Sequence, residues 1–335
     1  MKLPNLQFTK KQQELYNLAK ADAKEYHNHG LFTKLDMHIH SNMSDGLFSI
    51  PQLITMAKEF GLECIFITDH GTCLPGYNLL KSLPKEFIGN LDVNIGCEIA
   101  TKIEDPVTKK FIPIEILSYF ADPYKIQAFL DKYNFANNTS QEEQLKILQY
   151  TCDKLGLIYS DNLTVPKGCY STEVLCRDLI KYEKNKSFFL ERAPIVWDSP
   201  KLFYKMFVAN PDSDFYIDTT AGLPYYKDTI NAINNSGGYA IVAHPFLYSR
   251  HTEEEVKQLM DKIVDTSDIS GFEAIHSSHT NKQRKFIINY TKQKGLYYTG
   301  GSDFHCGSKT ILGYGQKSCP ILLTLDKCYL KNKFE

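Results

Sequence analysis

Side chains of the types that bind metal ions follow short apolar segments at widely separated places in this chain of 335 residues. The apolar segments alternate with stretches of helical spacing, which is typical of parallel β/α architecture. In β/α barrels the carboxyl ends of the strands meet at one face, and catalytic residues lie there. The pattern therefore predicts an α/β fold whose polar site is assembled from distant parts of the sequence.

The expected strands and helices divide the chain into three parts. Strands are expected at residues 35–40, 64–68, 94–99, 112–119, 239–243, 271–275 and 296–300. Helices are expected at residues 10–27, 50–60, 141–155, 172–182 and 227–235. Residues 122–225 interrupt the alternation and predict helices with irregular joins. We therefore expect an N-terminal helical extension at 1–34, a β/α domain formed by 35–121 and 226–335, and a helical insertion at 122–225.

The first expected strand carries the clearest candidate site. His38 and His40 lie two positions apart, so their side chains share one face of the strand. Asp45 follows in a Ser-Asp-Gly turn. Two imidazoles and a carboxylate at one strand end suit a divalent transition metal. A His-x-His pair also arises by chance, but the nearby aspartate weakens that explanation.

The other strand ends offer similar side chains, namely His70, Glu98, His244, Asp303 and His305. Asp69 is expected to orient its neighbour His70 or to cap the turn, more than to bind metal. A lone glutamate is usually solvated. Glu98, however, follows an apolar segment in the same way as the histidines follow theirs, and a carboxylate can bridge two metals. If the chain stays extended after residue 300, Asp303 and His305 point the same way.

Composition excludes several classes of protein. Apolar residues make up 43% and charged residues 23%, which is ordinary for a globular domain. The net charge of −1 provides no overall basic field for a long nucleic-acid duplex. Nine cysteines without a Cys-x-x-Cys pair indicate reduced thiols, and no apolar run approaches the roughly 20 residues that span a bilayer. We expect a cytoplasmic protein without a membrane partner.

In their order along the chain, these motifs resemble the polymerase and histidinol phosphatase (PHP) family. The motifs are His38-x-His40, Ser44-Asp45-Gly46, Thr68-Asp69-His70, Gly96-x-Glu98, Ala243-His244-Pro245 and Gly301-Ser302-Asp303-x-His305. The resemblance covers residues 35 to about 313 and looks closest to stand-alone members that include nucleotide phosphatases and 5′-to-3′ oligoribonucleases. It implies a distorted (β/α)₇ TIM-like barrel with a helical insertion as a cap. It also implies two or three divalent metal ions, typically manganese, iron or zinc.

The resemblance implies a metal-ligand set as well. One metal would be held by His38, His40, Glu98 and Asp303, with Glu98 bridging to a neighbouring metal. The neighbouring ligands would be Asp45, His70, His244 and His305. Glu115 stands where the family usually has a histidine. Because carboxylate is a harder ligand than imidazole, this departure leaves the occupancy or identity of the third metal open.

The phosphate-binding residues are less well defined. The segment after His244 lacks an arginine that the family often has there, so Arg250 or Arg177 is expected to bind phosphate. An ordinary surface role for Arg177 stays open. His279 is expected to contact substrate or to act as an acid, because the family often has a histidine near that place.

The expected reaction is hydrolysis of a phosphate ester by a metal-activated hydroxide that attacks phosphorus. His244 or His279 would protonate the leaving group. Asp45 is also expected to be a catalytic residue. The substrate would be small, either a nucleotide such as a nucleoside 3′,5′-bisphosphate or the 5′ end of a short oligonucleotide. The alternatives are a metabolite phosphatase like histidinol phosphatase, a catalytically weak metal-binding scaffold, and a metal-dependent amidohydrolase.

Overall fold

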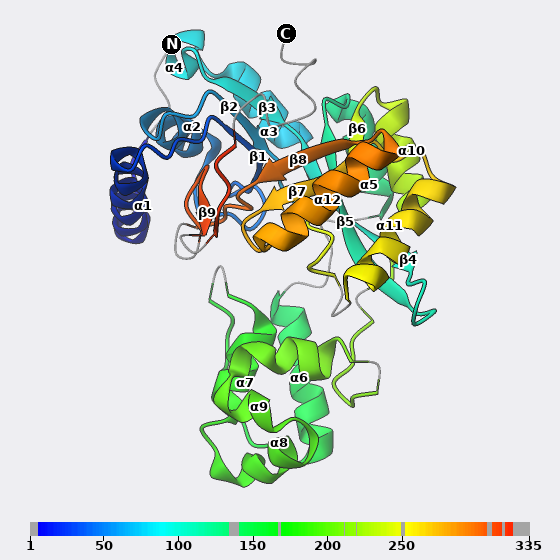
Figure 1. Cartoon of the computed structure of the whole chain (residues 1–335). Coiled ribbons are helices and arrows are strands. Elements are labelled where there is room, and N and C mark those ends of the chain that lie inside the picture. The colour runs from blue at the N-terminus through cyan, green and yellow to red at the C-terminus, as the bar shows by residue number, and fades with distance from the viewer. Residues whose placement is uncertain are drawn as a thin grey trace. The chain divides into compact units, whose positions relative to one another are not determined.

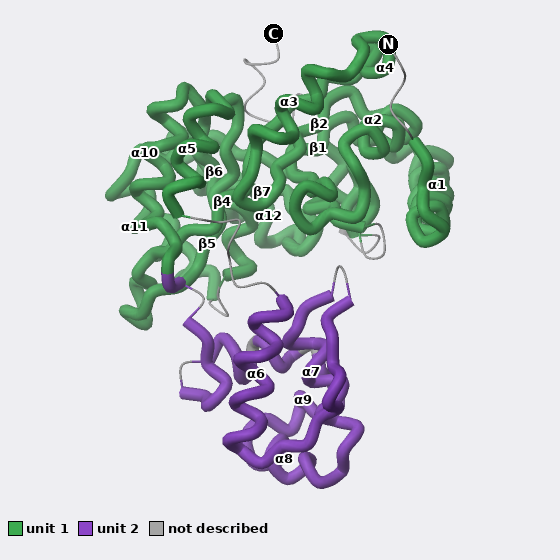
Figure 2. The backbone as a smooth tube through the Cα atoms, turned by 180° about the vertical axis from the view of Figure 1, so that it is seen from behind, with its two compact units in different colours: residues 1–136, 222–335 green, residues 137–221 purple. Residues whose placement is uncertain are grey.

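The computed structural model describes residues 6–133, 141–166, 169–210, 212–218, 220–248, 252–306, 310–316 and 319–323. The chain divides into two compact units, Met1–Ala136 with Gly222–Glu335 and Asn137–Ala221 (Figure 2). The second unit therefore begins later than residue 122, where the sequence predicts that the insertion starts. None of the helices in the described ranges combines the length and the apolar character needed to cross a bilayer.

The elements alternate as expected in the first unit and are helical in the second (Figure 1). The strands are β1 (Leu35–Ile39), β2 (Cys64–Ile67), β3 (Asp92–Ile95), β4 (Cys97–Glu104), β5 (Phe111–Tyr119), β6 (Tyr239–Val242), β7 (Gly271–His276), β8 (Tyr297–Gly301), β9 (Gly315–Gln316) and β10 (Cys319–Pro320). The helices of the first unit are α1 (Lys10–Asn28), α2 (Ile50–Glu59), α3 (Leu74–Ser82), α4 (Lys85–Ile88), α5 (Pro123–Tyr133), α10 (Tyr226–Asn235), α11 (Glu253–Thr266) and α12 (Asn281–Lys294). Those of the second unit are α6 (Gln141–Leu155), α7 (Ser171–Leu179), α8 (Lys186–Arg192) and α9 (Pro194–Asp198), with the 3₁₀ helices η2 (Glu183–Asn185) and η3 (Pro200–Leu202) and the π-helix η4 (Tyr204–Val208).

Strand direction departs from the sequence prediction in one place. Strands β1, β2 and β3 are parallel neighbours, as are β6, β7 and β8, but β5 runs antiparallel to both β4 and β6. Parallel neighbours need a crossover of a dozen or more residues. Only residues 105–110 separate β4 from β5, so these two strands pair as a hairpin.

The strand expected at 94–99 is interrupted, which changes the place of Glu98. Residues 92–95 pair with β2, whereas the chain from residue 97 onward pairs with β5. Glu98 therefore lies at the start of β4 and not at the end of a strand. Its backbone N–H donates to the carbonyl oxygens of Thr68 and Asp69, at 3.1 and 3.2 Å. The carboxylate is thus anchored at the end of β2.

The described strands form two larger sheets, β1-β2-β3 and β4-β5-β6-β7-β8, and not one closed sheet. Isolated parallel bridges join the two sheets, between Ile39 and Phe304 and between His70 and Glu98. At the first of these junctions, Phe304 follows Asp303, which has a positive φ of 54°. The described strands therefore form a mixed α/β fold with two bridged sheets, and they do not show the closed barrel that the resemblance implies.

Strands β1 and β8 approach closely because of Gly301. A Cβ atom at Gly301 would lie 2.3 Å from the Cβ of His38, a distance that real side chains do not show. Asp36 in β1 also stabilises this junction between β1 and the segment after β8. Its buried carboxylate accepts hydrogen bonds from the backbone N–H of Ser302 at 2.9 Å and of Gly313 at 2.7 Å. This junction sets the position of the first histidine.

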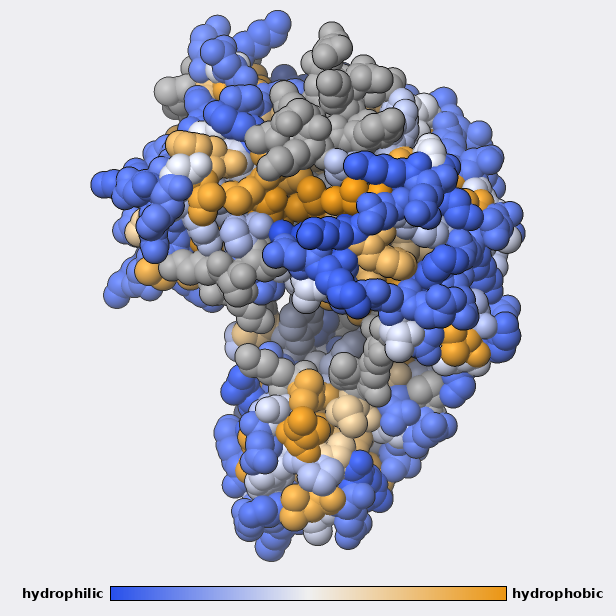
Figure 3. Space-filling model, in the orientation of Figure 1, coloured by the Kyte–Doolittle hydropathy of each residue, from blue (hydrophilic) through white to orange (hydrophobic). Residues whose placement is uncertain are grey.

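Helices bury apolar faces against the sheets. Helix α10 packs on β4, β5 and β6, and α12 packs on β7 and β8. Helices α11 and α12 begin with capping boxes, Thr252 with Glu255 and Thr280 with Gln283, which pair otherwise unsatisfied N–H groups of the first turn. The second unit has its own core, which is rich in phenylalanine. The surface of the chain that is visible in Figure 3 is largely hydrophilic, with smaller hydrophobic patches.

Candidate metal centre

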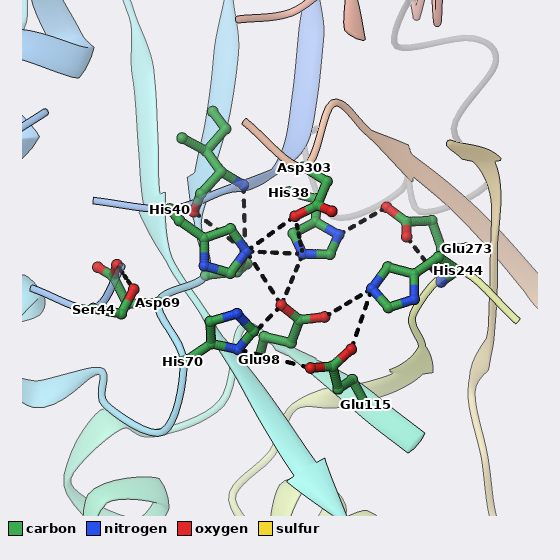
Figure 4. A network of polar contacts seen from close by, with 12 residues as sticks. His38, His40, Ser44, Asp69, His70, Glu98, Glu115, His244, Glu273 and Asp303 are labelled. Carbon is green, nitrogen blue, oxygen red and sulfur yellow. Dashed lines mark hydrogen bonds and ion pairs between the residues drawn. The ribbon is translucent and has the colours of Figure 1, made fainter. Parts of the chain in front are cut away.

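Four side chains from three parts of the first unit meet in one place (Figure 4). His38 and His40 come from β1 and the residue after it, Glu98 from β4, and Asp303 from the segment after β8. The Nε2 atoms of the two histidines lie 3.1 Å apart. Glu98 Oε2 lies 3.1 Å from His38 Nε2, and Asp303 Oδ1 lies 3.3 Å from His40 Nε2. The donor atoms of these four residues are close enough to surround one metal ion.

A second group lies on the other side of His40 and is more exposed. Asp45 Oδ2 lies 3.2 Å from His305 Nε2 and 3.8 Å from His70 Nε2. The side chains of Asp45, His70 and His305 are 42%, 35% and 28% exposed, whereas His38 and His40 are fully buried. Solvent therefore reaches the site from the side of this second group.

A third group includes Glu115, the carboxylate that stands where the family resemblance predicts a histidine. Glu98 Oε1 lies 3.1 Å from His244 Nε2, and Glu115 Oε2 lies 3.4 Å from the same nitrogen. Glu115 Oε1 also lies 4.0 Å from His70 Nδ1. Because Glu98 contacts members of all three groups, it has the position that a bridging carboxylate needs.

The charges in the site favour a bound cation. Burial alone would lower the pKa of His40 and of His244, but contacts with Glu98, and for His40 also with Asp303, raise these values to about 10 and about 9. Burial and the neighbouring Glu98 raise the pKa of Glu115 to about 8. The buried carboxylates thus attract positive charge strongly.

The atoms also fit a metal ion geometrically. The Nε2 atoms of His38 and His40 face each other at 3.1 Å, so at least one of them carries a proton in the metal-free protein, and a metal ion at that point would displace it. The Nδ1 atom of His40, which lies 3.7 Å from Asp45 Oδ1 in the second group, is buried and has no hydrogen-bond partner among the described residues. A divalent cation between the nitrogens and carboxylates would satisfy the converging lone pairs, and imidazole with carboxylate is a donor set of manganese, iron or zinc.

Two of the candidate residues have strained backbones. His244 and Asp303 have positive φ angles of 22° and 54°, a region that costs non-glycine residues on the order of 1–3 kcal/mol. The chain is therefore not extended at Asp303, which was the condition under which the sequence predicts that Asp303 and His305 lie on one side. His305 and Asp303 nevertheless converge, with His305 Nδ1 3.5 Å from Asp303 Oδ1, because the left-handed residue turns the chain back.

Two residues at the site were not predicted as part of it. Glu273, fully buried in β7, accepts hydrogen bonds from His38 Nδ1 at 3.1 Å and from the backbone N–H of His244 at 3.0 Å. His276, at the end of the same strand, has its Nε2 3.5 Å from Asp303 Oδ2. The available signal was an acidic residue inside an otherwise apolar strand, where a charge needs a partner.

Asp69 orients the loop after β1, whereas the sequence predicts that it orients His70 or caps the following turn. It accepts hydrogen bonds from the backbone N–H and hydroxyl of Ser41, at 2.7 and 2.6 Å. It also accepts one from the hydroxyl of Ser44 at 2.6 Å. These bonds hold the loop that carries Asp45.

The expected substrate residues lie outside these groups. His279 is buried, and its Nδ1 donates to the carbonyl oxygen of Ala274 at 3.0 Å. Burial and the neighbouring His276 lower its pKa to about 3, which favours a neutral ring over an acid. Arg177 lies on α7 in the second unit and pairs with Glu173 at 2.6 Å. Arg250 lies outside the described residues. The phosphate-binding roles of both arginines stay predictions.

Comparison with known proteins identifies relatives over most of the chain. The model of the PHP domain family matches residues 36–273. A 5′-3′ exoribonuclease of Haemophilus influenzae is 25% identical over 276 residues, which cover 82% of this chain and 91% of that protein. A phosphoribosyl 1,2-cyclic phosphate 1,2-diphosphodiesterase of Eggerthella lenta is 23% identical over 273 residues, covering 81% and 93%.

A solved structure shares the fold. An amidohydrolase from Chromobacterium violaceum, with bound sulfate and no metal, superimposes with a TM-score of 0.58 at 18% identity. The match covers 87% of this chain and 93% of the other. The similarity in fold therefore extends over nearly the whole of both chains.

Proposed function

The chain belongs to the PHP domain family, and from this membership and the geometry of the site we propose that it is a metal-dependent phosphoesterase. The observation that carries the proposal is the meeting of His38, His40, Glu98 and Asp303 around one point. These residues are separated by up to 265 positions in the sequence. A convergence of imidazoles and carboxylates at such separations serves metal binding better than it serves the stability of the fold, because burying charges is costly.

We assign the metal ligands by group. His38, His40, Glu98 and Asp303 would hold one ion, and Asp45, His70 and His305 a second. His244, Glu115 and Glu98 would hold a third, so that two or three ions of manganese, iron or zinc fit the donors. Bound there, such ions would lower the pKa of a water molecule and stabilise negative charge on the phosphate oxygens.

The exposed side of the site defines how substrate approaches. Phosphate would enter past Asp45, His70 and His305, whose side chains are 42%, 35% and 28% exposed. The side chain of Glu115, at 29%, is exposed to a similar extent. His244 offers one nitrogen, Nε2, to the carboxylates. The same nitrogen cannot hold a metal and also deliver a proton, so we assign His244 as a ligand and not as the acid.

The substrate class proposed is a nucleotide or the 5′ end of a short oligonucleotide. The named activities of the two curated relatives are an exoribonuclease and a cyclic-phosphate diesterase, so both act on phosphodiesters. The net charge of −1 is compatible with a short substrate held by metals. The fold proposed remains a distorted (β/α)₇ barrel with a helical insertion, counting β3 and β4 as one interrupted strand, and the insertion corresponds to the second unit, Asn137–Ala221.

The test is a hydrolysis assay with the full chain loaded with Mn²⁺. Substrates would be a 5′-phosphorylated short RNA, a nucleoside 3′,5′-bisphosphate and histidinol phosphate, and products would be separated by chromatography. We expect mononucleotides from the RNA or inorganic phosphate from the bisphosphate. H38A should abolish turnover, whereas H29A, which replaces an exposed histidine that bonds to the carbonyl of Glu25, should not.

The outcomes separate the alternatives. Phosphate release from histidinol phosphate alone would replace the nucleotide proposal with a metabolite phosphatase. Tight Mn²⁺ binding without hydrolysis of any ester would support a metal-binding scaffold and contradict the proposed enzyme. Equal activity of H38A and the wild type would contradict the site itself.

A further inference from the structure

Glu273 is a buried carboxylate that forms hydrogen bonds with two candidate metal ligands, His38 and His244. It lies in β7 with no exposed surface, between the apolar residues Phe272 and Ala274. A buried carboxylate is unfavourable unless hydrogen bonds compensate its lost hydration. Both of its oxygen atoms have such partners, and each partner belongs to a different histidine (Figure 4).

The first oxygen determines which nitrogen of His38 faces the metal groups. Oε1 lies 3.1 Å from His38 Nδ1, and a carboxylate can only accept, so Nδ1 carries the proton. Nε2 is then the nitrogen that faces Glu98 Oε2, 3.1 Å away, and the one that would bind a metal ion in place of a proton. A hydrogen bond to the far nitrogen sets the tautomer and ring orientation of a metal-binding histidine.

The second oxygen holds the backbone of His244. Oε2 accepts from its N–H at 3.0 Å, at a residue whose φ of 22° is unfavourable without support. This conformation directs the His244 ring at the other oxygen of Glu98, with Nε2 and Oε1 3.1 Å apart. The two histidine rings are nearly parallel, with centroids 5.7 Å apart.

We infer that Glu273 is a positioning residue that fixes the spacing of two metal-binding histidines across Glu98. Glu98 faces His38 and His244 from the metal side, and Glu273 holds the same two residues from the strand side. Loss of Glu273 would therefore weaken the first and third metal groups together. The inference rests on the proposed function only in taking these groups as metal sites.

The test measures metal binding without substrate. Mn²⁺ would be titrated calorimetrically into the metal-free wild type, E273Q and E63Q, the last a control at an exposed glutamate that pairs with Lys34. A glutamine side chain accepts with one atom and donates with the other, so it cannot satisfy two donors. We expect a loss of affinity of roughly 10- to 100-fold in E273Q, the usual effect of losing a residue that orients a ligand. Wild-type affinity in E273Q would overturn the inference.

A second measurement needs no variant and is informative even if E273Q does not fold. In wild-type protein loaded with diamagnetic Zn²⁺, nitrogen NMR of the imidazoles should show His38 protonated on Nδ1. A proton on Nε2 of His38 would overturn the inference. Because neither experiment uses a substrate, a chain that binds metal in this way but hydrolyses no ester would refute only the proposed function.

Discussion

At the scale of single residues, Glu98 has the widest contacts in the candidate centre. One carboxylate oxygen lies near His38, His40 and His70, and the other lies near His244. Its neighbours overcome the effect of burial and hold its pKa well below the usual value, so it is ionised. A single charge thus serves several groups of donors.

Replacing this charge should remove most of the activity. E98Q keeps the size of the side chain but offers one oxygen in place of two and no charge. We expect turnover with Mn²⁺ to fall by at least about 100-fold, the upper end of the effect of losing an orienting residue. Metal content after gel filtration, measured by elemental analysis, should fall with it. E104Q, on the same strand and 3.9 Å from Lys262, is the matched control and should keep both.

The sequence predicts some residues of the candidate metal centre and misses others. His38, His40, Asp303 and His305 were recognisable because paired polar residues recur at short spacing after an apolar segment. Glu273 has no such neighbour at period two, and its role depends on a contact with a residue 235 positions away. Long-range partners of single charges are not encoded in any local pattern.

At the scale of elements, the site depends on how closely β1 and β8 approach. The backbone N–H of Asp303 donates to the carbonyl oxygen of His38 at 2.9 Å, and Gly301 leaves no room for a side chain. Most expected strands and helices agree with the structure to within a few residues. The reversed direction of β5 was missed because local periodicity gives the face of a strand but not its direction.

G301A should therefore separate these strands. The added Cβ would meet the backbone N of His38 at 2.5 Å, so the strand must shift. We expect destabilisation of about 1–3 kcal/mol, as for other overpacked interiors, in urea unfolding of the metal-free protein. G76A, whose Cβ would lie 3.3 Å from the end of the Ile50 side chain, should change stability by no more than about 1 kcal/mol. Equal stability of the two variants would contradict the close approach.

At the scale of the whole molecule, the chain consists of two units with separate cores. The residues of all the candidate metal groups belong to the first unit, whereas Leu145, Leu175, Phe189 and Phe203 belong to the core of the second. Composition and the change of pattern indicated an insertion, but its boundaries depend on which helices pack together. Helix α5 belongs to the first unit because it packs with α3 and α10.

Metal binding should consequently stabilise one unit selectively. Mn²⁺ at about 100 times its dissociation constant adds roughly 2.7 kcal/mol to a unit that binds it only when folded. We expect hydrogen exchange to slow in peptides from β1, β4 and β7 and to stay unchanged in α6 and α7. Equal slowing in both units would argue against metal sites confined to the first.

The most direct test of the account is anomalous diffraction at the manganese absorption edge from crystals soaked in Mn²⁺. The account predicts a strong peak between His38, His40, Glu98 and Asp303, with one or two further peaks beside Asp45 and Glu115. Peaks only elsewhere in the molecule, or none in crystals that keep their diffraction, would contradict it.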